Sequence, residues 1–282
     1  MQLLPLVLAF AIHDGQLTRD AAGNVVEADF TGTWITDADL AKVGRMPKLR
    51  RLVLSQAKIT DAAMEHLRGL TEVRELDCHY AEYLTEDGVA HITGWKKIER
   101  LNLRGTQVTS KVFEHLARMT SLRDVDIAFT QVDDEGFEQL VQLPHLERLA
   151  MGGNRLTGSA VQVLRPIRTL VHLDVGGIQR VDSGLWGLPL TPENLRRLGQ
   201  LTQLRSLNLN GATLSDRGTD RPGNPEAERA EIRDLSALAS LRQLEFLDLS
   251  RLPVTEAVIA PLRQLPKLRE IRTRMTAVQS AR

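Results

Sequence analysis

Three histidines are the residues of this 282-residue chain whose type and spacing come nearest to a metal site. His66, His91 and His115 recur at intervals of about 24 residues, which fits a repeating unit. A zinc ion would need three imidazole nitrogens at about 2.0–2.1 Å from one point. Histidines on neighbouring helices, with axes about 8–10 Å apart, do not converge easily in this way. We therefore expect an exposed histidine row that becomes more positive below about pH 6.5, and no metal site.

The single cysteine is the centre of a second candidate for chemistry. Asp77 and His79 flank Cys78 and would share one face of a strand, but no nucleophile or oxyanion donor accompanies them. Cys78 itself stands at an apolar position, which favours a buried hydrophobe over a reactive thiol. The chain also has no glycine-rich phosphate loop, Gly-x-Ser-x-Gly or His-Glu-x-x-His motif. The sequence therefore predicts a protein that is not an enzyme and has no cofactor.

The composition describes a soluble globular protein without a dominant charge. Hydrophobic residues make up 42% of the chain and charged residues 26%, and 36 basic residues balance 36 acidic ones. A neutral chain has no overall field that would attract nucleic acid or anionic lipid. No apolar run is long enough to span a bilayer. We therefore expect neither nucleic acid binding nor an integral membrane segment.

A sequence pattern that repeats along the chain determines where all of these residues lie in the fold. The pattern Leu-x-x-Leu-x-Leu, with apolar variants, recurs at a register of about 24 residues from Val25–Phe30 to Leu268–Ile271. Ten strands are predicted, one for each copy. A second motif follows the strands, as in Ile59–Leu70, where Thr60 can cap a short helix and apolar residues spaced by three form its buried face.

These residues resemble the leucine-rich repeat family, especially its ribonuclease-inhibitor-like and cysteine-containing subclasses of bacterial type, over roughly residues 23–275. The resemblance implies an α/β solenoid, or horseshoe, with a parallel sheet on the concave face and short helices on the convex face. Members share the repeat spacing and not a ligand, so the resemblance specifies the fold more than the function. A continuous asparagine ladder is absent, because the usual asparagine position holds Thr33, Ala57, Thr106, Thr130, Asn154 or Ala212.

The amino-terminal segments precede the repeats. Residues 1–11 are expected to be a signal peptide, because the apolar run Leu3–Phe10 leads into the small-x-small pattern Ala9–Ala11. This predicts a periplasmic or secreted protein. The alternative is an apolar flap over the first strand of a cytoplasmic protein. Residues 12–24 are expected to form a cap, and the turn residues Asp20–Asn24 indicate a hairpin that covers the open sheet edge.

The repeat domain is expected at residues 25–275, followed by a tail at 276–282. Two insertions break its register, one near 181–190 and one near 215–230. Each falls between a strand and its helix, so both should protrude as loops beside neighbouring repeats. Either insertion is a functional loop or a tolerated surface insertion.

The strand positions that face outward form columns across the sheet. In one column the sign of the charge alternates from strand to strand, and adjacent strands are about 4.8 Å apart, within reach of an ion pair. This column contains Glu27, Arg51, Glu75, Arg100, Asp124 and Arg148. A second column carries Asp29, Asp77, Asp126 and Asp174, about 10 Å apart, which needs no bound cation. The amino-terminal half of the concave face is therefore predicted to be self-compensated.

The carboxyl-terminal half of the same face is predicted to bind the ligand. Its outward positions carry uncommitted hydrogen-bonding groups and an exposed aromatic residue, and both insertions arise from these repeats. The alternative is that these polar residues only keep the sheet soluble. The predicted ligand-binding residues are His172, Asp174, Ser206, Asn208, Asn210, Phe246 and Asp248.

Two classes of function follow from a large regular surface without catalytic motifs. The first is a non-catalytic scaffold that binds a protein or peptide through the concave face, chiefly its carboxyl-terminal half, and nearby loops. The alternative is a carbohydrate or cell-envelope binding module, for which Trp34, Trp186 and Phe246 would supply stacking platforms. Solvent-facing tryptophans beside polar groups would favour the alternative.

Overall fold

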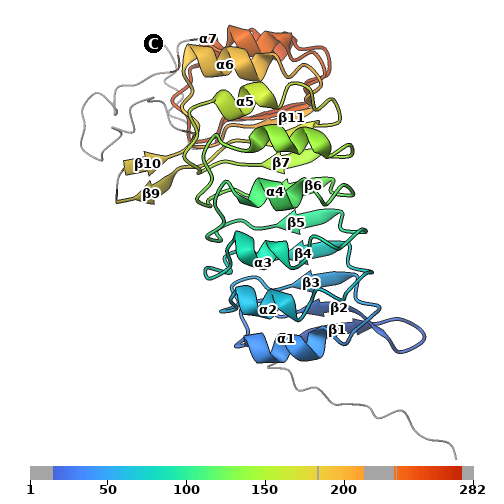
Figure 1. Ribbon diagram of the computed structural model, residues 1–282. Coiled ribbons are helices and arrows are strands. Elements are labelled where there is room, and N and C mark those ends of the chain that lie inside the picture. The colour runs from blue at the N-terminus through green and yellow to red at the C-terminus, as the bar shows by residue number, and fades with distance from the viewer. Residues whose placement is uncertain (1–14, 183, 213–231, 233, 275–282) are drawn as a thin grey trace, which may run out of the picture.

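The computed structural model describes residues 15–182, 184–212, 232 and 234–274, and it shows a stack of strand-and-helix units (Figure 1). The strands lie along one side of the stack and most of the short helices along the other. Each helix packs next to the helix of the following unit, as the contacts between α1 and α2 and between α2 and α3 illustrate. We use "concave face" for the side of the sheet that is turned away from the helices.

One sheet of eleven strands runs through the whole stack, with its strands in the order in which they occur along the chain. The first strand is antiparallel to its neighbour, and the other ten are parallel. The prediction of ten repeat strands is therefore confirmed. They are β2 (Val25–Asp29), β3 (Arg51–Val53), β4 (Glu75–Asp77), β5 (Arg100–Asn102), β6 (Asp124–Asp126), β7 (Arg148–Ala150), β8 (His172–Asp174), β11 (Ser206–Asn208), β12 (Phe246–Asp248) and β13 (Glu270–Arg272).

The predicted hairpin covers the first edge of this sheet. Strand β1 (Gln16–Arg19) pairs with β2 in antiparallel register. Asp20 shapes the turn, because its Oδ1 accepts hydrogen bonds from the amides of Ala22 and Asn24, each at 2.9 Å. With this short, polar hairpin at the edge, the sheet is less prone to pair with a strand of another molecule than it would be with an uncovered parallel strand.

Short helices return the chain from each strand to the next. Several begin at threonine, as predicted: the Thr60 and Thr85 hydroxyls accept hydrogen bonds from Ala62 N and Asp87 N. Three of the helices are 3₁₀ helices, which the apolar spacing did not distinguish from α-helices. The helices are α1 (Asp37–Val43), α2 (Asp61–Glu65), α3 (Glu86–Ala90), α4 (Val112–Leu116), η1 (Phe137–Gln142), α5 (Ser159–Val163), α6 (Pro192–Gly199), η2 (Ser236–Ser240), α7 (Glu256–Ile259) and η3 (Leu262–Gln264).

The capping threonines also join successive repeats. In the amino-terminal half, an acidic residue at or shortly before the start of one helix accepts both the backbone N–H and the hydroxyl of the threonine that precedes the next helix. For Asp61 and Thr85 these two distances are 2.8 and 2.7 Å. We call this arrangement the threonine clasp. It occurs in the pairs Asp37–Thr60, Asp61–Thr85, Glu86–Thr109 and Asp134–Thr157.

The core is a continuous stack of the repeated apolar residues. Leu52, Leu76, Leu101 and Val125 lie side by side in the sheet register and are almost completely inaccessible to solvent. Cys78 is also fully buried, and this burial raises the pKa of its thiol. Cys78 is therefore a core residue, as predicted.

The first insertion forms a hairpin of its own. Strands β9 (Gln179–Val181) and β10 (Gly184–Trp186) pair in antiparallel register and project from the stack (Figure 1). The Gln179 amide, oriented to donate, holds the base of the hairpin against the Gly153 carbonyl at 2.9 Å. The expected signal peptide, the tail at 276–282 and the second insertion near 215–230 lie outside the described residues. No helix in the described part of the chain combines the length and the apolar character that crossing a bilayer requires.

Candidate binding surface

The first outward column of the concave face has the predicted register. Glu27, Arg51, Glu75, Arg100 and Asp124 occupy matching positions on successive strands. The column continues through Arg148, His172, Ser206, Phe246 and Glu270.

Charge compensation in this column is strongest around Glu75. Its carboxylate accepts a hydrogen bond from Arg51 Nε at 2.9 Å and another from Arg100 Nε at 2.8 Å. Burial acts to raise the pKa of Glu75, but these two arginines more than offset it and hold the pKa below its usual value. Further along, burial raises the pKa of Asp124 despite Arg148 and Arg100 nearby, and no ion pair within 4.0 Å joins Asp124 in the described structure. Self-compensation is therefore real at Glu75 and incomplete at Asp124.

The second outward column closes the turns that follow the strands. The Oδ1 atom of each acidic or amide residue accepts the backbone N–H two residues later, as Asp77 does from His79 at 2.8 Å. Asn102 and Asn208 make the same bond to Arg104 and Asn210. The column therefore has a structural role, which by itself explains why it carries aspartate or asparagine.

Two aspartates of this second column are desolvated. Burial raises the pKa of Asp126 to about 6, although Arg104 acts in the opposite direction. Burial also raises the pKa of Asp174, against hydrogen bonds from Gly176 N and Asn208. The middle of the concave face therefore holds carboxylates whose loss of hydration outweighs the effect of the cation nearby, which for Asp126 is Arg104 at 3.8 Å.

The predicted ligand-binding residues come together on three neighbouring strands. His172, Ser206 and Phe246 are aligned in the first column of β8, β11 and β12. The second column of the same strands holds Asp174, Asn208 and Asp248, and Asn210 lies two residues beyond Asn208. The sequence register thus placed all seven on one continuous patch.

The expectation that the polar groups of this patch are uncommitted is wrong for three of them. Asn208 Nδ2 donates to Asp174 Oδ2 at 3.0 Å, so these two side chains bind each other. Asp248 is only 8% exposed, and its Oδ1 accepts the Ser250 amide at 2.8 Å. The cause is the same two-residue turn that uses up the rest of the second column.

The expectation of an exposed aromatic residue is also corrected. Phe246 is half-buried, and the guanidinium of Arg272 covers its ring at 4.6 Å from the centroid. In contrast, the side chains of His172 and Ser206 make no hydrogen bond among the described residues. Burial lowers the pKa of His172, which favours its neutral imidazole.

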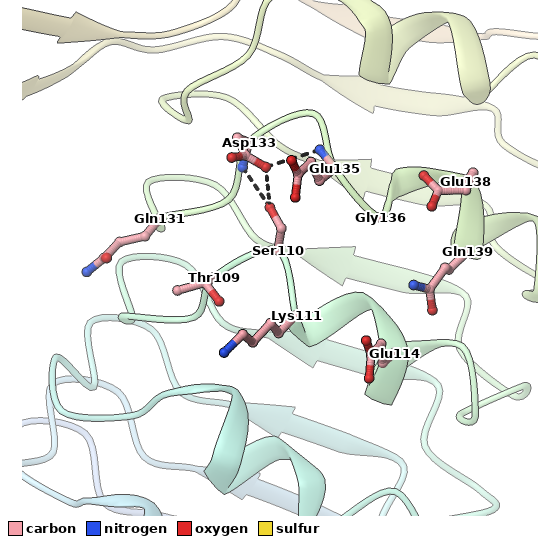
Figure 2. A pocket seen from close by; sticks show the side chains of 10 residues that line it. All are labelled: Thr109, Ser110, Lys111, Glu114, Gln131, Asp133, Glu135, Gly136, Glu138 and Gln139. Carbon is pink, nitrogen blue, oxygen red and sulfur yellow. Dashed lines mark hydrogen bonds between the residues drawn. The ribbon is translucent and has the colours of Figure 1, made fainter.

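A hollow of about 260 Å³ opens on the concave face over β4 to β6, and β7 separates it from this patch. It is lined by Glu75, Leu76, Asp77, Arg100, Leu101, Asn102, Asp124 and Asp126. A second hollow, of about 650 Å³, lies outside the sheet, between the start of α4 and the start of η1 (Figure 2).

The second hollow is lined by four acidic residues and one basic residue, Lys111, among polar neighbours. Figure 2 shows its lining side chains coming from two successive repeats, with Ser110 and Asp133 bonded at its centre. Ser110 Oγ donates to Asp133 Oδ1 at 2.6 Å and accepts the Asp133 amide at 2.9 Å. This pair replaces a threonine clasp. Gly136, at φ 80°, then starts η1, where the neighbouring repeats have an α-helix. Sequence reasoning missed this hollow, because its signal was only the substitution of a threonine by Asp133.

The histidine row does not form a cluster. His66 and His91 cap the carboxyl ends of α2 and α3, and His115 lies in the last turn of α4. Nowhere in the described ranges do three or more His, Cys, Asp or Glu side chains gather as a metal site would require.

Comparison with known proteins agrees with this fold. A family model described as "Leucine Rich repeat" matches residues 118–141, the span of one repeat. This match and the solenoid agree that the chain has the leucine-rich repeat fold. No protein in a curated set matches the chain.

Three solved structures illustrate the similarity. An internalin (inlF) from Listeria monocytogenes has a TM-score of 0.58 at 19% identity, covering 89% of this chain and 68% of that one. An internalin C2 from the same organism has a TM-score of 0.50 at 20% identity, with coverages of 88% and 80%. The leucine-rich repeat ectodomain of the Arabidopsis thaliana receptor kinase GASSHO1/SCHENGEN3 has a TM-score of 0.53 at 19% identity, with coverages of 91% and 31%. At these identities the similarity establishes the fold and not the ligand.

Proposed function

We propose that this chain is a non-catalytic scaffold that binds a protein or peptide through its concave face, chiefly the carboxyl-terminal half, and nearby loops. The fold carries a wide, regular surface, and similar solenoids are generally binding modules. The GASSHO1/SCHENGEN3 ectodomain structure is of a complex with CASPARIAN STRIP INTEGRITY FACTOR 2. That protein offers an example of binding by this fold, which the proposal extends to the present chain.

The observation that carries the choice of the carboxyl-terminal half is the unequal commitment of its polar groups. A partner that docks at Glu75 must compete with two arginines that already bind this carboxylate. At β8 and β11, the half-buried side chains of His172 and Ser206 have no partner among the described residues to displace. A partner that binds there pays a smaller free-energy cost, because it displaces no existing hydrogen bond of these two side chains.

The test is to identify a partner with the purified protein and then titrate variants by calorimetry. His172→Ala together with Ser206→Ala removes the two side chains that have no partner among the described residues and should weaken binding by about 1–3 kcal/mol. Arg51→Ala and Glu75→Ala are matched controls in the same sheet and should each change affinity by less than about 0.5 kcal/mol. A loss confined to the two control variants would move the site to the amino-terminal half and contradict the proposal.

Carbohydrate or cell-envelope binding is the second candidate, and Trp34 favours it. The Trp34 side chain is 75% exposed, and Lys58 Nζ lies 5.1 Å from the centroid of its ring. Trp186 is half-buried on β10, and the strands from β3 to β8 separate its repeat from that of Trp34. The two rings therefore cannot form one platform. Under this candidate, a glycan array should give a ligand whose binding Trp34→Ala abolishes and Phe246→Ala does not.

A further inference from the structure

The Arg104 side chain, on the concave face, is more buried than those of Arg51 and Arg100 but makes fewer hydrogen bonds among the described residues than either of them. Its side chain is 24% exposed, whereas those of Arg51 and Arg100 are 38% and 58% exposed. Arg51 and Arg100 both bind Glu75, but the Arg104 guanidinium makes no hydrogen bond within the described structure, and its Nη1 atom is fully buried without a partner. A guanidinium carries five N–H donors, and leaving them unpaired away from water is costly.

The nearest carboxylate cannot take these donors. Asp126 Oδ2 lies 3.8 Å from Arg104 Nε, which is too long for a hydrogen bond. Asp126 is held back because its Oδ1 atom accepts the Ala128 amide at 2.9 Å in the turn after β6. The carboxylate nearest to Arg104 is therefore too far away to accept a hydrogen bond from it. The turn bond between Asp126 and Ala128 maintains this separation.

Two aromatic residues flank Arg104 in backbone conformations that bulky residues rarely adopt. Tyr80 follows β4 and Phe129 follows β6, on the two sides of the Arg104 strand, with φ values of 53° and 57°. A left-handed conformation costs about 1–2 kcal/mol for a residue other than glycine. Phe129 places its ring 4.8 Å from the Arg104 guanidinium carbon. The exposed Tyr80 ring lies over Gly105, where an added Cβ would be 2.5 Å from the ring.

The positions that match Arg104 on the following strands carry no long side chain. On the next strands, the outward position of Arg104 is held by Ala128, Gly152 and Gly176. All three residues are buried, so Arg104 is the projecting side chain of this row, and a partner chain that lay along the row would meet it first. The planar guanidinium fork matches a carboxylate in two parallel hydrogen bonds.

We propose that Arg104, between Tyr80 and Phe129, is an anchoring subsite for the side-chain carboxylate of an Asp or Glu in an extended partner peptide. This inference rests on the proposed function, because it names the chemistry of one contact that a protein or peptide partner makes. It also extends the binding surface from β8–β12 back to β5.

The experiment begins with a random twelve-residue peptide library displayed at the amino terminus of a phage coat protein. Selection on the full-length chain then offers side-chain carboxylates and no free carboxyl terminus. We expect the enriched peptides to share an Asp or Glu at one fixed position. Enriched peptides without an acidic residue would overturn the subsite and leave the scaffold proposal standing. Failure to enrich any peptide would count against both.

A double-mutant cycle on one selected peptide completes the test. Arg104→Gln should weaken the peptide about tenfold to a hundredfold, as expected for the loss of a charge-assisted hydrogen-bonded pair. Replacing the acidic residue of the peptide by its amide should have a similar effect, and the two changes together should cost little more than either one. Arg104→Lys should bind with intermediate affinity, because it keeps the charge and loses the fork.

The control variant is Arg51→Gln, which removes an arginine already paired with Glu75 and should change affinity less than twofold. Thermal unfolding of each variant shows whether the fold is intact. Equal losses for Arg51→Gln and Arg104→Gln, or independent effects of the two partners in the cycle, would contradict a specific carboxylate contact at Arg104.

Discussion

The amino-terminal and carboxyl-terminal halves of the solenoid share a core and differ in how their repeats are joined at the surface. In the first half, threonine clasps and the Glu75 ion pairs connect carboxylates to donors on the next repeat. In the second half, Thr191 caps only its own helix at Asn194 N, and Thr255 makes no capping bond. Amides and hydroxyls take over the connections, as when Ser240 Oγ donates to the Gly199 carbonyl.

This difference coincides with the insertions. A clasp needs an acidic residue directly after the threonine position of one unit, and before α5 that place is held by Gly158. The succession of clasps is therefore interrupted between α5 and α6, where Asn194 Nδ2 instead donates to the Thr157 carbonyl at 2.9 Å. Where succession is regular, the polar groups of one repeat are used by its neighbour. Where it is interrupted, some polar groups remain available, as His172 and Ser206 are in the described structure.

The largest effect should be the same in both halves, because it concerns the shared core. Leu101 and Leu207 are buried at equivalent inward positions. Leu101→Ala and Leu207→Ala should each lower the free energy of unfolding by about 2–5 kcal/mol, through a cavity that the stacked repeats cannot close. Chemical denaturation measures both. A much smaller loss for Leu207→Ala would break the comparison by showing a loosely packed second half.

The threonine clasp gives the next effect and should separate the halves. Asp61→Ala leaves the Thr85 amide and hydroxyl without their acceptor, which should cost about 1–3 kcal/mol. The matched change is Glu256→Ala, since Glu256 also follows a capping threonine, Thr255, but binds only Arg263. We expect no measurable change in the unfolding midpoint for that variant. Equal destabilisation would mean that helix-start charge, and not the clasp, stabilises the first half.

A pH effect should appear at the border between the halves, at Asp126. Its pKa of about 6 lies above the ordinary value of 3.8, so the folded state favours the protonated carboxyl and stability declines as pH rises between these values. Asp126→Asn should remove this decline and stabilise the protein by about 1–2 kcal/mol at pH 7. Asparagine fits, because Asn102 and Asn208 make the same turn bond. Unfolding curves at pH 4 and pH 7 test this, and a variant less stable at pH 7 would contradict it.

The smallest effect should come from the ion pairs on the concave face. Arg100→Ala removes one of the two arginines at Glu75, but the Arg100 side chain is more than half exposed. We expect a loss of less than about 1 kcal/mol, further reduced by salt. Chemical denaturation beside Leu101→Ala gives the contrast. Similar losses for these two neighbouring residues would mean that the inward and outward positions have been assigned the wrong way round.

Much of the fold was predictable because it depends on the regular spacing of apolar residues along the sequence. The spacing of Leu101, Leu52 and their equivalents determines which side chains face inward, and therefore which face outward in columns. The alternating register of Arg51 and Glu75 followed from the same spacing. Distances between the ends of the side chains did not follow from it. Nothing in the sequence alone indicated that Asn208 binds Asp174 or that Arg272 covers Phe246.

The left-handed turns had a signal that the sequence reasoning did not use. The position after each strand exit is glycine in several repeats, as at Gly32, Gly105 and Gly153, and all three have positive φ. Tyr80 and Phe129 stand at the same register position, so their strain could have been inferred from alignment of the repeats. The lack of a hydrogen bond from the Arg104 guanidinium among the described residues could not be inferred in this way, because it depends on which atom of Asp126 the turn uses.

The threonine clasp also bears on how a chain of this kind can change its length during evolution. Each regular repeat contributes one acceptor to the unit after it and one pair of donors to the unit before it. Whole units can therefore be duplicated or lost without leaving a carboxylate acceptor or a threonine donor without its hydrogen-bond partner. The exception is Ser110 and Asp133, where the roles are exchanged. Deletion of the unit that begins with Thr109 and Ser110 would bring Asp133 against Glu86, two carboxylates with no donor between them, so copy number should be constrained at this point and free on either side of it.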